Sequence, residues 1–474
     1  MLAHRAVVAL AMLLGVACSS ASVQSTPQPT PSGPPPGFTA GAYEGTTSGG
    51  AAYKIEAPTN WNGTLLLYSH GYVGPGAANP ARDVGDPTTA KYLLERGFAL
   101  AGTSYSTSGW AVEQAFKDQT DVLDLVAQKV GKPSRTIAWG HSLGGMITAG
   151  LVQRDPERFQ GALPMCGVLA GGVGVWDMSL DGQFVATTLL APTASIQLVR
   201  IGDPNANVKI AQAMYAEAQK TPAGRARLSL AAAVSGVPGW FSAASPEPSA
   251  TDFTALQLNQ EIWQEQVDAV FVFGLRAELE KRAGGNPSSN VGVDYARQLD
   301  ASPSRAEVSA LYQTAGLNLQ EDLGVLARAP RVSADPTARE YLRRFITFDG
   351  DLKIPVLTMH TSGDGLVPVE EEHAYGQTVA RATRSALLRQ LFVHRAGHCA
   401  FTPAETVTAL GALIKRIDTG TWPDLTPSEL ASSAKLLGDE YNAILVQGKP
   451  APVPAAFFRF DPAAVPRPFD AYVK

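Results

Sequence analysis

RTIAWGHSLGGMITAGLVQR, residues 135–154, begins with a β-strand pattern and ends with a helix pattern. The apolar residues within 135–140 predict a buried strand, and residues 143–154 predict a helix. Between them, GHSLG at 140–144 matches the G-x-S-x-G turn, which presents a serine hydroxyl at the carboxyl edge of a sheet. The glycines suit this turn because it leaves no room for side chains. Ser142 is therefore the predicted nucleophile.

The alternation of strand and helix patterns extends to both sides of this motif. Strands are predicted at 51–57, 64–69, 98–105, 161–166, 354–360 and 387–394, and helices at 88–96, 110–130, 403–417 and 427–446. This spacing predicts an α/β fold, a mostly parallel sheet flanked by helices. Residues 167–348 interrupt the alternation with a mainly helical pattern. We therefore predict one α/β core, residues 38–166 and 349–474, with 167–348 inserted as a helical lid over the site.

A serine nucleophile needs a base, and the chain has seven histidines. His398 lies in the loop after the last predicted core strand, where a fold of this type carries its base, so it is the predicted base. His360 ends a strand, His373 lies in a helix and His394 lies inside a strand. We interpret these three as structural or surface residues.

The third member of a triad is a carboxylate that orients the imidazole. Asp364 follows the strand at 354–360 and is expected at the same edge as the serine. Asp349 and Asp351 precede that strand and are expected at the opposite edge. Asp364 is therefore the predicted acid, with Asp177 in reserve.

Four features together resemble the α/β-hydrolase superfamily: the order Ser, Asp, His, the turn GHSLGG, the His70-Gly71 pair, and SGDGLVP at 362–368. The resemblance covers about 51–166 and 354–417. It implies a serine hydrolase that needs no cofactor. It also implies an oxyanion hole built from backbone N–H groups, for which Leu143 and Tyr72 are the candidates.

Two smaller features resemble the tannase and feruloyl-esterase group. Trp61-Asn62-Gly63 precedes a core strand, and Cys399 directly follows the predicted base. That group has a disulfide from a Cys just before its serine, where this chain has His141. A related disulfide is predicted between Cys166 and Cys399, because both are expected at the top of the sheet. It would restrain the loop that carries His398.

The first 37 residues predict an export signal and a tether. Residues 1–20 combine a positive charge, a short apolar run and a cleavage region of small residues. The apolar run is shorter than the roughly 20 residues that a membrane-spanning helix needs. Val16-Ala17-Cys18 also resembles the end of a bacterial lipoprotein box. Secretion and a lipid anchor at Cys18 are therefore both open. The Pro/Ser/Thr-rich residues 21–37 predict an extended tether.

Composition excludes some classes of function. The formal net charge is −5 and no Lys/Arg-rich run occurs, so no nucleic-acid partner is indicated. No His-Glu-x-x-His or Cys-x-x-Cys pattern is present, so no metal site is predicted.

The sequence thus predicts an exported serine hydrolase that cleaves carboxylic esters through an acyl-enzyme. The insertion carries aromatic residues that are more often helix core than substrate contacts: Trp240, Phe241, Phe253, Trp263, Phe271 and Phe273. If a few of them face the site, an apolar or aromatic ester is favoured. One alternative is a secreted aminopeptidase-like enzyme that binds a free amino terminus through Glu261 or Glu265. The other is a non-catalytic surface binding protein.

Overall fold

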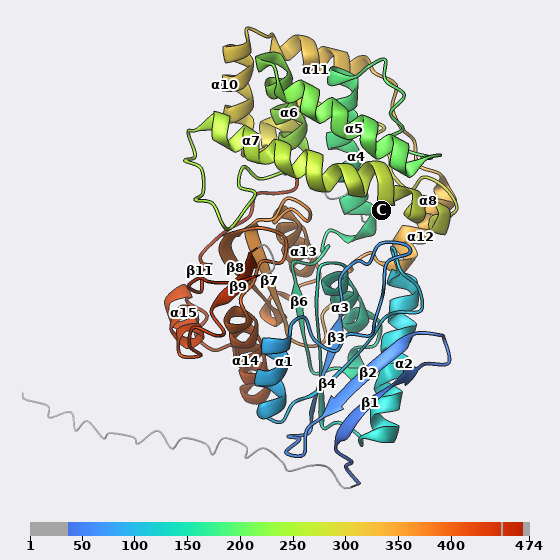
Figure 1. The fold of residues 1–474 in the computed structure, drawn as a ribbon, viewed down its shortest axis with the longest axis vertical. Coiled ribbons are helices and arrows are strands. Elements are labelled where there is room, and N and C mark those ends of the chain that lie inside the picture. The colour runs from blue at the N-terminus through green and yellow to red at the C-terminus, as the bar shows by residue number, and fades with distance from the viewer. Residues whose placement is uncertain (1–36, 447–448, 468–474) are drawn as a thin grey trace, which may run out of the picture.

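The computed structural model describes residues 37–446 and 449–467, which form a sheet-based core with a helical layer above it (Figure 1). The predicted signal at 1–20, including Cys18, lies outside the described residues, as does the predicted tether up to residue 36.

Nine strands form one sheet in the order β1-β2-β4-β3-β5-β6-β7-β8-β11. The strands from β4 to β8 pair in parallel, whereas β1, β2 and β11 add antiparallel edges. Their bounds are β1 Gly41–Thr46, β2 Ala52–Ala57, β3 Thr64–Ser69, β4 Ala99–Thr103, β5 Arg135–His141, β6 Gly161–Met165, β7 Val356–Gly363, β8 Leu388–Ala396 and β11 Phe457–Phe458. The parallel order brings the carboxyl ends of β3 and β5 to β8 to one edge. The predicted α/β fold is confirmed.

Helices cover both faces of the sheet because the central strands are apolar on both faces. In β3, Leu65 and Leu67 pack into one hydrophobic cluster, and Leu66 and Tyr68 into another. The first cluster includes α2 Val112–Lys129, α3 Leu143–Arg154 and α13 Glu370–Arg381, and the second includes α1 Pro87–Glu95, α14 Pro403–Thr419 and α15 Pro427–Lys435. Each loop at the carboxyl edge is thus anchored by a strand packed on two sides.

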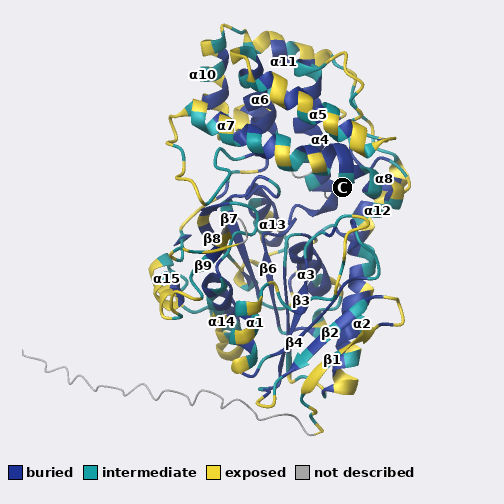
Figure 2. Cartoon of the chain, in the orientation of Figure 1, coloured by how far each residue is buried: buried dark blue, intermediate teal, exposed yellow. Residues whose placement is uncertain are grey.

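The helices between β6 and β7 form a separate layer, the cap (residues 171–345), above the carboxyl edge (Figure 1). Its helices are α4 Gly171–Leu190, α5 Pro204–Gln219, α6 Pro222–Ser235, α7 Phe253–Trp263, α8 Arg276–Ala283, α9 Tyr295–Ala301, α10 Arg305–Ala315, α11 Leu319–Arg328 and α12 Pro336–Phe345. Two π-helical segments, η2 Gln264–Asp268 and η3 Phe271–Leu275, lie between α7 and α8. The cap has its own buried core, as Figure 2 shows. Within the described ranges, no helix is long and apolar enough to cross a membrane.

The C-terminal part of the chain differs from the prediction. The helix predicted over 427–446 is wrong beyond Lys435, where α15 ends. Gly438 has a φ of 88°, a conformation that a right-handed helix does not contain. The chain then enters β9, Ala443–Val446, which pairs antiparallel with β10, Lys449–Pro452. The edge strand β1 was not predicted either, because its residues are mostly exposed and lack an apolar pattern.

A buried ion-pair cluster ties the C-terminal tail to the cap. Asp177 in α4 is fully buried, and its Oδ2 accepts hydrogen bonds from Arg339 at 3.0 Å and from Arg467 at 3.0 Å. Arg467 also donates to Asp181 Oδ1 at 2.6 Å. Because a charge buried without a partner is costly, each side chain of this cluster depends on the others.

A disulfide joins the two sides of the carboxyl edge. Cys166 directly follows β6 and bonds Cys399 in the loop after β8, with 5.3 Å between their Cα atoms. The bond spans 233 residues of chain, including the whole cap. It therefore closes a long loop in the unfolded chain and fixes the loop after β8 in the folded one.

Removing the carboxylate of Asp177 should destabilise the protein strongly. We expect Asp177→Ala to lower the free energy of unfolding by about 3–5 kcal/mol, because it removes the acceptor that the buried Arg467 and the half-buried Arg339 share. Urea denaturation followed by tryptophan fluorescence measures the change. Glu217→Ala, which breaks an exposed ion pair with Lys220, is the matched control and should have little effect. Equal midpoints for the two variants would contradict the prediction.

Loss of the disulfide should cost about 2–4 kcal/mol of stability. Cys166→Ser, Cys399→Ser and the double variant should lose nearly the same amount, because each removes the same single bond. Urea denaturation with and without dithiothreitol measures this, and the reductant should destabilise only the unsubstituted protein. Additive losses in the double variant would show that packing of the thiols, not the bond, is the source.

Candidate active site

Ser142 lies in a strained turn between β5 and α3. Its φ is 58° and its ψ is −126°, values that a non-glycine residue rarely adopts. The turn is crowded: a Cβ added to Gly140 would lie 2.4 Å from the Ser69 carbonyl oxygen, and one added to Gly144 would lie 1.9 Å from it. Glycine is therefore required at both positions, and the serine side chain is left at the carboxyl edge of the sheet.

Ser142, His398 and Asp364 form one hydrogen-bonded line. The Nε2 atom of His398 is 2.8 Å from the Oγ atom of Ser142. Its Nδ1 atom is 2.6 Å from the Oδ2 atom of Asp364. The structure thus brings together three residues predicted from distant parts of the sequence. A base hydrogen-bonded to a hydroxyl and oriented by a carboxylate is the arrangement that activates a serine.

Asp364 is held in its ionised form. Its Oδ1 atom accepts hydrogen bonds from the backbone N–H groups of Leu366 at 3.1 Å and Val367 at 3.0 Å. Burial favours the neutral acid, but the positive charges of His398 and His360 and their hydrogen bonds outweigh it and hold the pKa of Asp364 below its usual value. The carboxylate can therefore stabilise a protonated His398.

The two candidate oxyanion residues both lie beside Ser142. Leu143 is the first residue of α3. The loop before Tyr72 passes so close that a Cβ on Gly71 would be 3.3 Å from the Cβ of Ser142. Tyr105 supports this loop, because its ring stacks on His70 with centroids 4.0 Å apart and its hydroxyl donates to the His70 carbonyl at 2.9 Å. The oxyanion role of the Leu143 and Tyr72 amides stays a prediction.

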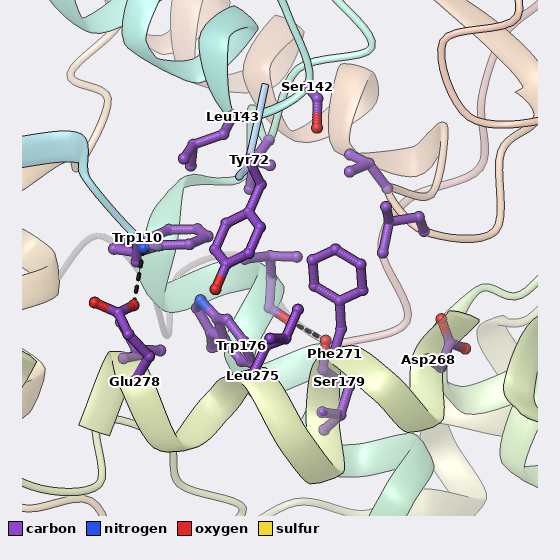
Figure 3. A pocket seen from close by; sticks show the side chains of 16 residues that line it. Tyr72, Trp110, Ser142, Leu143, Trp176, Ser179, Asp268, Phe271, Leu275 and Glu278 are labelled. Carbon is purple, nitrogen blue, oxygen red and sulfur yellow. Dashed lines mark hydrogen bonds between the residues drawn. The ribbon is translucent and has the colours of Figure 1, made fainter. Parts of the chain in front are cut away.

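A cavity of about 60 Å³ opens at Ser142, between the core and the cap. Figure 3 shows the side chains that surround it. The core contributes Tyr72, Trp110 and Leu143, and the cap contributes Trp176, Phe271 and Leu275. The cavity is therefore mainly apolar and rich in aromatic rings.

Two carboxyl groups also line the cavity. Glu278 is engaged, because it accepts a hydrogen bond from the Trp110 backbone N–H at 2.9 Å and pairs with Arg282 at 2.5 Å. Asp268 receives no hydrogen bond from another described side chain or backbone group. Burial, reinforced by the negative charge of Asp364, raises the pKa of Asp268 well above its usual value.

Other residues singled out in the sequence lie elsewhere. The reserve acid Asp177 belongs to the ion cluster of the cap, so it is not the partner of His398. Glu261 and Glu265, the insertion carboxyl groups expected near the site, do not line the cavity, whereas Asp268 does. Of the six insertion aromatics, Phe271 lines the cavity, while Phe273 is in the cap core.

Sequence reasoning missed three contributors to the site. Asp268 and Trp176 lie within the long helical insertion, where periodicity does not show which face meets the core. His360, interpreted as structural, lies 3.5 Å from Asp364. Its position in β7, four residues before Asp364, was a usable signal. Among the described residues, no group of three His, Cys, Asp or Glu side chains is arranged to hold a metal ion.

The comparisons with known proteins agree with this geometry. A family model of the prolyl oligopeptidase family (Peptidase_S9) matches residues 96–176, which include the Ser142 turn. The o-phthalyl amidase of Xanthobacter agilis is 29% identical over 420 residues, which cover 81% of this chain and 89% of that protein.

Solved structures with similar folds include esterases and peptidases. Feruloyl esterase B from Aspergillus oryzae aligns with a TM-score of 0.40 and 17% identity, over 81% of this chain and 82% of that one. The acylaminoacyl peptidase of Pyrococcus horikoshii aligns with a TM-score of 0.33 and 10% identity, over 76% of this chain and 38% of that one. These likenesses are too distant to identify a substrate. The sheet order and the strained serine turn are those of an α/β-hydrolase fold, and the family match over the Ser142 turn supports a serine hydrolase of this type.

Proposed function

We propose that the chain hydrolyses esters and amides of small aromatic carboxylic acids through an acyl-enzyme on Ser142. The observation that carries the proposal is the hydrogen-bonded line Ser142–His398–Asp364 opening directly onto an aromatic cavity. An activated nucleophile beside an apolar cavity favours acyl transfer from a group that fills the cavity.

In the first half-reaction, His398 Nε2 takes the proton of the Ser142 hydroxyl while Oγ bonds to the substrate carbonyl carbon. The negative oxygen that forms is stabilised by the backbone N–H groups of Leu143 and Tyr72. The C–O or C–N bond then breaks, and His398 gives its proton to the leaving alcohol or amine. Asp364 stabilises the imidazolium throughout.

In the second half-reaction, water takes the place of the leaving group. His398 accepts a proton from the water as its oxygen bonds to the acyl carbon. The bond to Oγ breaks, and the proton returns from His398 to Ser142. The products are a carboxylic acid and the original enzyme, and no further reactant is consumed.

The choice of an aromatic acyl group rests on the cavity walls. Tyr72 and Phe271 meet edge to face with ring centroids 5.5 Å apart, and Trp110 and Trp176 do so at 5.6 Å. Ring edges and faces of this kind bind another aromatic ring well. The relative from Xanthobacter agilis is named for an o-phthalyl group and an amide bond, which supports both the acyl class and the inclusion of amides.

A panel of phenyl esters and anilides tests the proposal. We expect kcat/KM for benzoyl-type esters to exceed that for acetyl esters of equal chemical reactivity by at least about tenfold, because the ring fills the aromatic cavity. Ser142→Ala should lower kcat by about three orders of magnitude or more. The matched control is Ser179→Ala, a cavity hydroxyl that bonds to Val175 O within α4. Turnover that survives Ser142→Ala would exclude the mechanism.

Asp268 favours a second candidate function, hydrolysis next to a free amino group. An unengaged carboxyl group in an apolar cavity would pair with a substrate ammonium group. Aminoacyl anilides and their deaminated counterparts distinguish the two functions on the same enzyme. A large preference for the aminoacyl compounds that disappears in Asp268→Asn would favour the second candidate over the first.

A further inference from the structure

Two polar atoms in the cavity wall have no partner within the described part of the chain. They are the hydroxyl oxygen of Tyr72 and the indole nitrogen of Trp176, and both are buried. Both residues line the cavity that contains Ser142. A buried donor left without an acceptor costs about 1–3 kcal/mol, so native proteins rarely retain one without a reason.

The positions of these atoms place them away from the reacting centre. In Figure 3 the Tyr72 hydroxyl points away from Ser142, into the same end of the cavity as the nitrogen-bearing edge of Trp176. The Tyr72 hydroxyl stays protonated, because burial and the nearby Glu278 raise the pKa of Tyr72. An indole nitrogen can only donate. Both groups therefore present hydrogen-bond donors at the far end of the cavity.

We propose that Tyr72 and Trp176 form a subsite for a neutral hydrogen-bond acceptor on the acyl group, remote from the bond that is cleaved. The proposal rests on the proposed function and names its substrate more closely: an aromatic acid with a carbonyl, ether or hydroxyl oxygen on the ring. The Tyr72 side chain would do this while its backbone N–H serves the oxyanion.

The charges around the subsite favour a neutral acceptor over an anion. Glu278 lines the same cavity and pairs with Arg282, and no Lys or Arg is among the lining residues. An anionic oxygen there would meet a carboxylate without a cation of its own. A neutral oxygen loses little hydration free energy when it leaves water, and it can accept hydrogen bonds from both donors.

Paired substrates measure the subsite directly. Phenyl 4-acetylbenzoate and phenyl 4-isopropylbenzoate, with their 3-substituted isomers, differ mainly in one acceptor oxygen. In one of the two isomer pairs, we expect kcat/KM of the acetyl ester to be about tenfold higher than that of the isopropyl ester. Both values are first divided by the rate of alkaline hydrolysis of the same ester, which removes the difference in chemical reactivity. Tyr72→Phe and Trp176→Phe should each reduce this preference about three- to tenfold. Because the preference is a ratio within one variant, a general loss of activity does not affect it.

Two variants outside the cavity serve as controls. Tyr341→Phe removes a hydroxyl bonded to Glu113, and Trp422→Phe removes an indole nitrogen bonded to the Ala386 carbonyl. Both should keep the full preference. If the unsubstituted enzyme hydrolyses the esters through Ser142 but shows no preference for the acetyl compound, the subsite is overturned. If Tyr72→Phe or Trp176→Phe keeps the full preference, the role of the substituted residue is overturned. If no ester is hydrolysed at all, the proposed function itself fails.

An independent observation concerns His360, a fully buried residue that lies beside Asp364. Its Nε2 atom is 2.9 Å from the Val367 carbonyl oxygen and 3.5 Å from Asp364 Oδ2. Its Nδ1 atom is 3.4 Å from Glu372 Oε1. A neutral imidazole has one donor and one acceptor nitrogen, yet both ring nitrogens here face acceptors.

We infer that His360 is a permanent imidazolium that holds Asp364 ionised and oriented for His398, and is thus a positioning residue of the triad. Glu372 supports this role, because its Oε2 accepts hydrogen bonds from Thr358 at 2.5 Å and Gln390 at 2.6 Å. These donors hold the carboxyl group of Glu372 in place, with its Oε1 atom toward the imidazole.

The other charged groups nearby are consistent with a cation at this position. Burial is the main opposing effect, but Asp364 and Glu372 outweigh it and raise the pKa of His360 to about 10. From α13, burial raises the pKa of Glu370 to about 7 and that of Glu371 to about 8. From the cap, Asp268 faces Asp364. These raised pKa values reduce the negative charge of Glu370, Glu371 and Asp268 at neutral pH, so Asp364 and Glu372 are the groups that favour protonated His360.

Nitrogen-15 NMR of the histidine-labelled protein tests the charge of His360 without reference to activity. At pH 8.5, where an ordinary histidine is neutral, one ring should show two protonated nitrogens. His360→Gln should remove that signal, and His394→Gln, at an exposed histidine paired with Glu247, should not. The absence of an imidazolium signal in the unsubstituted protein overturns the inference.

The pH profile of kcat/KM tests the effect on the triad. A positive charge beside Asp364 opposes protonation of His398. Without it, His398 accepts its second proton more easily, so the acid limb of the profile should move to higher pH. We expect a shift of roughly 0.5–1 unit in His360→Gln and none in His394→Gln. A lower kcat with an unmoved acid limb would show a structural role only.

Discussion

The backbone of Ser142 is held at a φ of 58° by the crowding of β3, β5 and α3 around it. Such a conformation costs of order 1–3 kcal/mol and persists only where the surroundings enforce it. Here the enforcement comes from the parallel sheet, because the Ser69 carbonyl at the end of β3 leaves space only for glycine at positions 140 and 144. The same sheet sets the loops after β7 and β8 beside the serine. Every other property of the site depends on this edge.

The core and the cap contribute different things to the site. The core supplies the groups that would react, and the disulfide between Cys166 and Cys399 fixes the loop of His398 to the end of β6. The cap supplies most of the far cavity wall, and it is tied down by polar contacts. Glu278 bonds the Trp110 backbone, and Arg282 bonds the Ser108 carbonyl at 2.8 Å. Changes in the cap can therefore alter which acyl group fits without disturbing the triad.

The fold and the candidate triad could be predicted from the sequence because both follow local rules. A strand, a glycine turn and a helix occur in one short segment at Ser142, and the loops that follow two later strands contain Asp364 and His398. The disulfide between Cys166 and Cys399 could be predicted in the same way, because each cysteine follows a strand at the carboxyl edge of the sheet. The tail could not be predicted, since its apolar pattern does not reveal that α15 ends at Lys435 and that Gly438, three residues later, has a positive φ. The contacts of His360 could not be predicted, because Glu372 approaches it from a different element, α13.

The cavity residues of the cap could not be predicted, for a reason that lies in the helix itself. In a regular helix, residues seven apart lie on nearly the same face, so Glu261, Glu265 and Asp268 would point together. The π-helical segment η2 begins after Glu261 and contains both Glu265 and Asp268, and η3 follows. A π turn accommodates one extra residue, which rotates the following face by about 100°. Asp268 and Phe271 therefore line the cavity that contains Ser142 while Glu261 does not, and a period of 3.6 residues fails to predict the cavity wall.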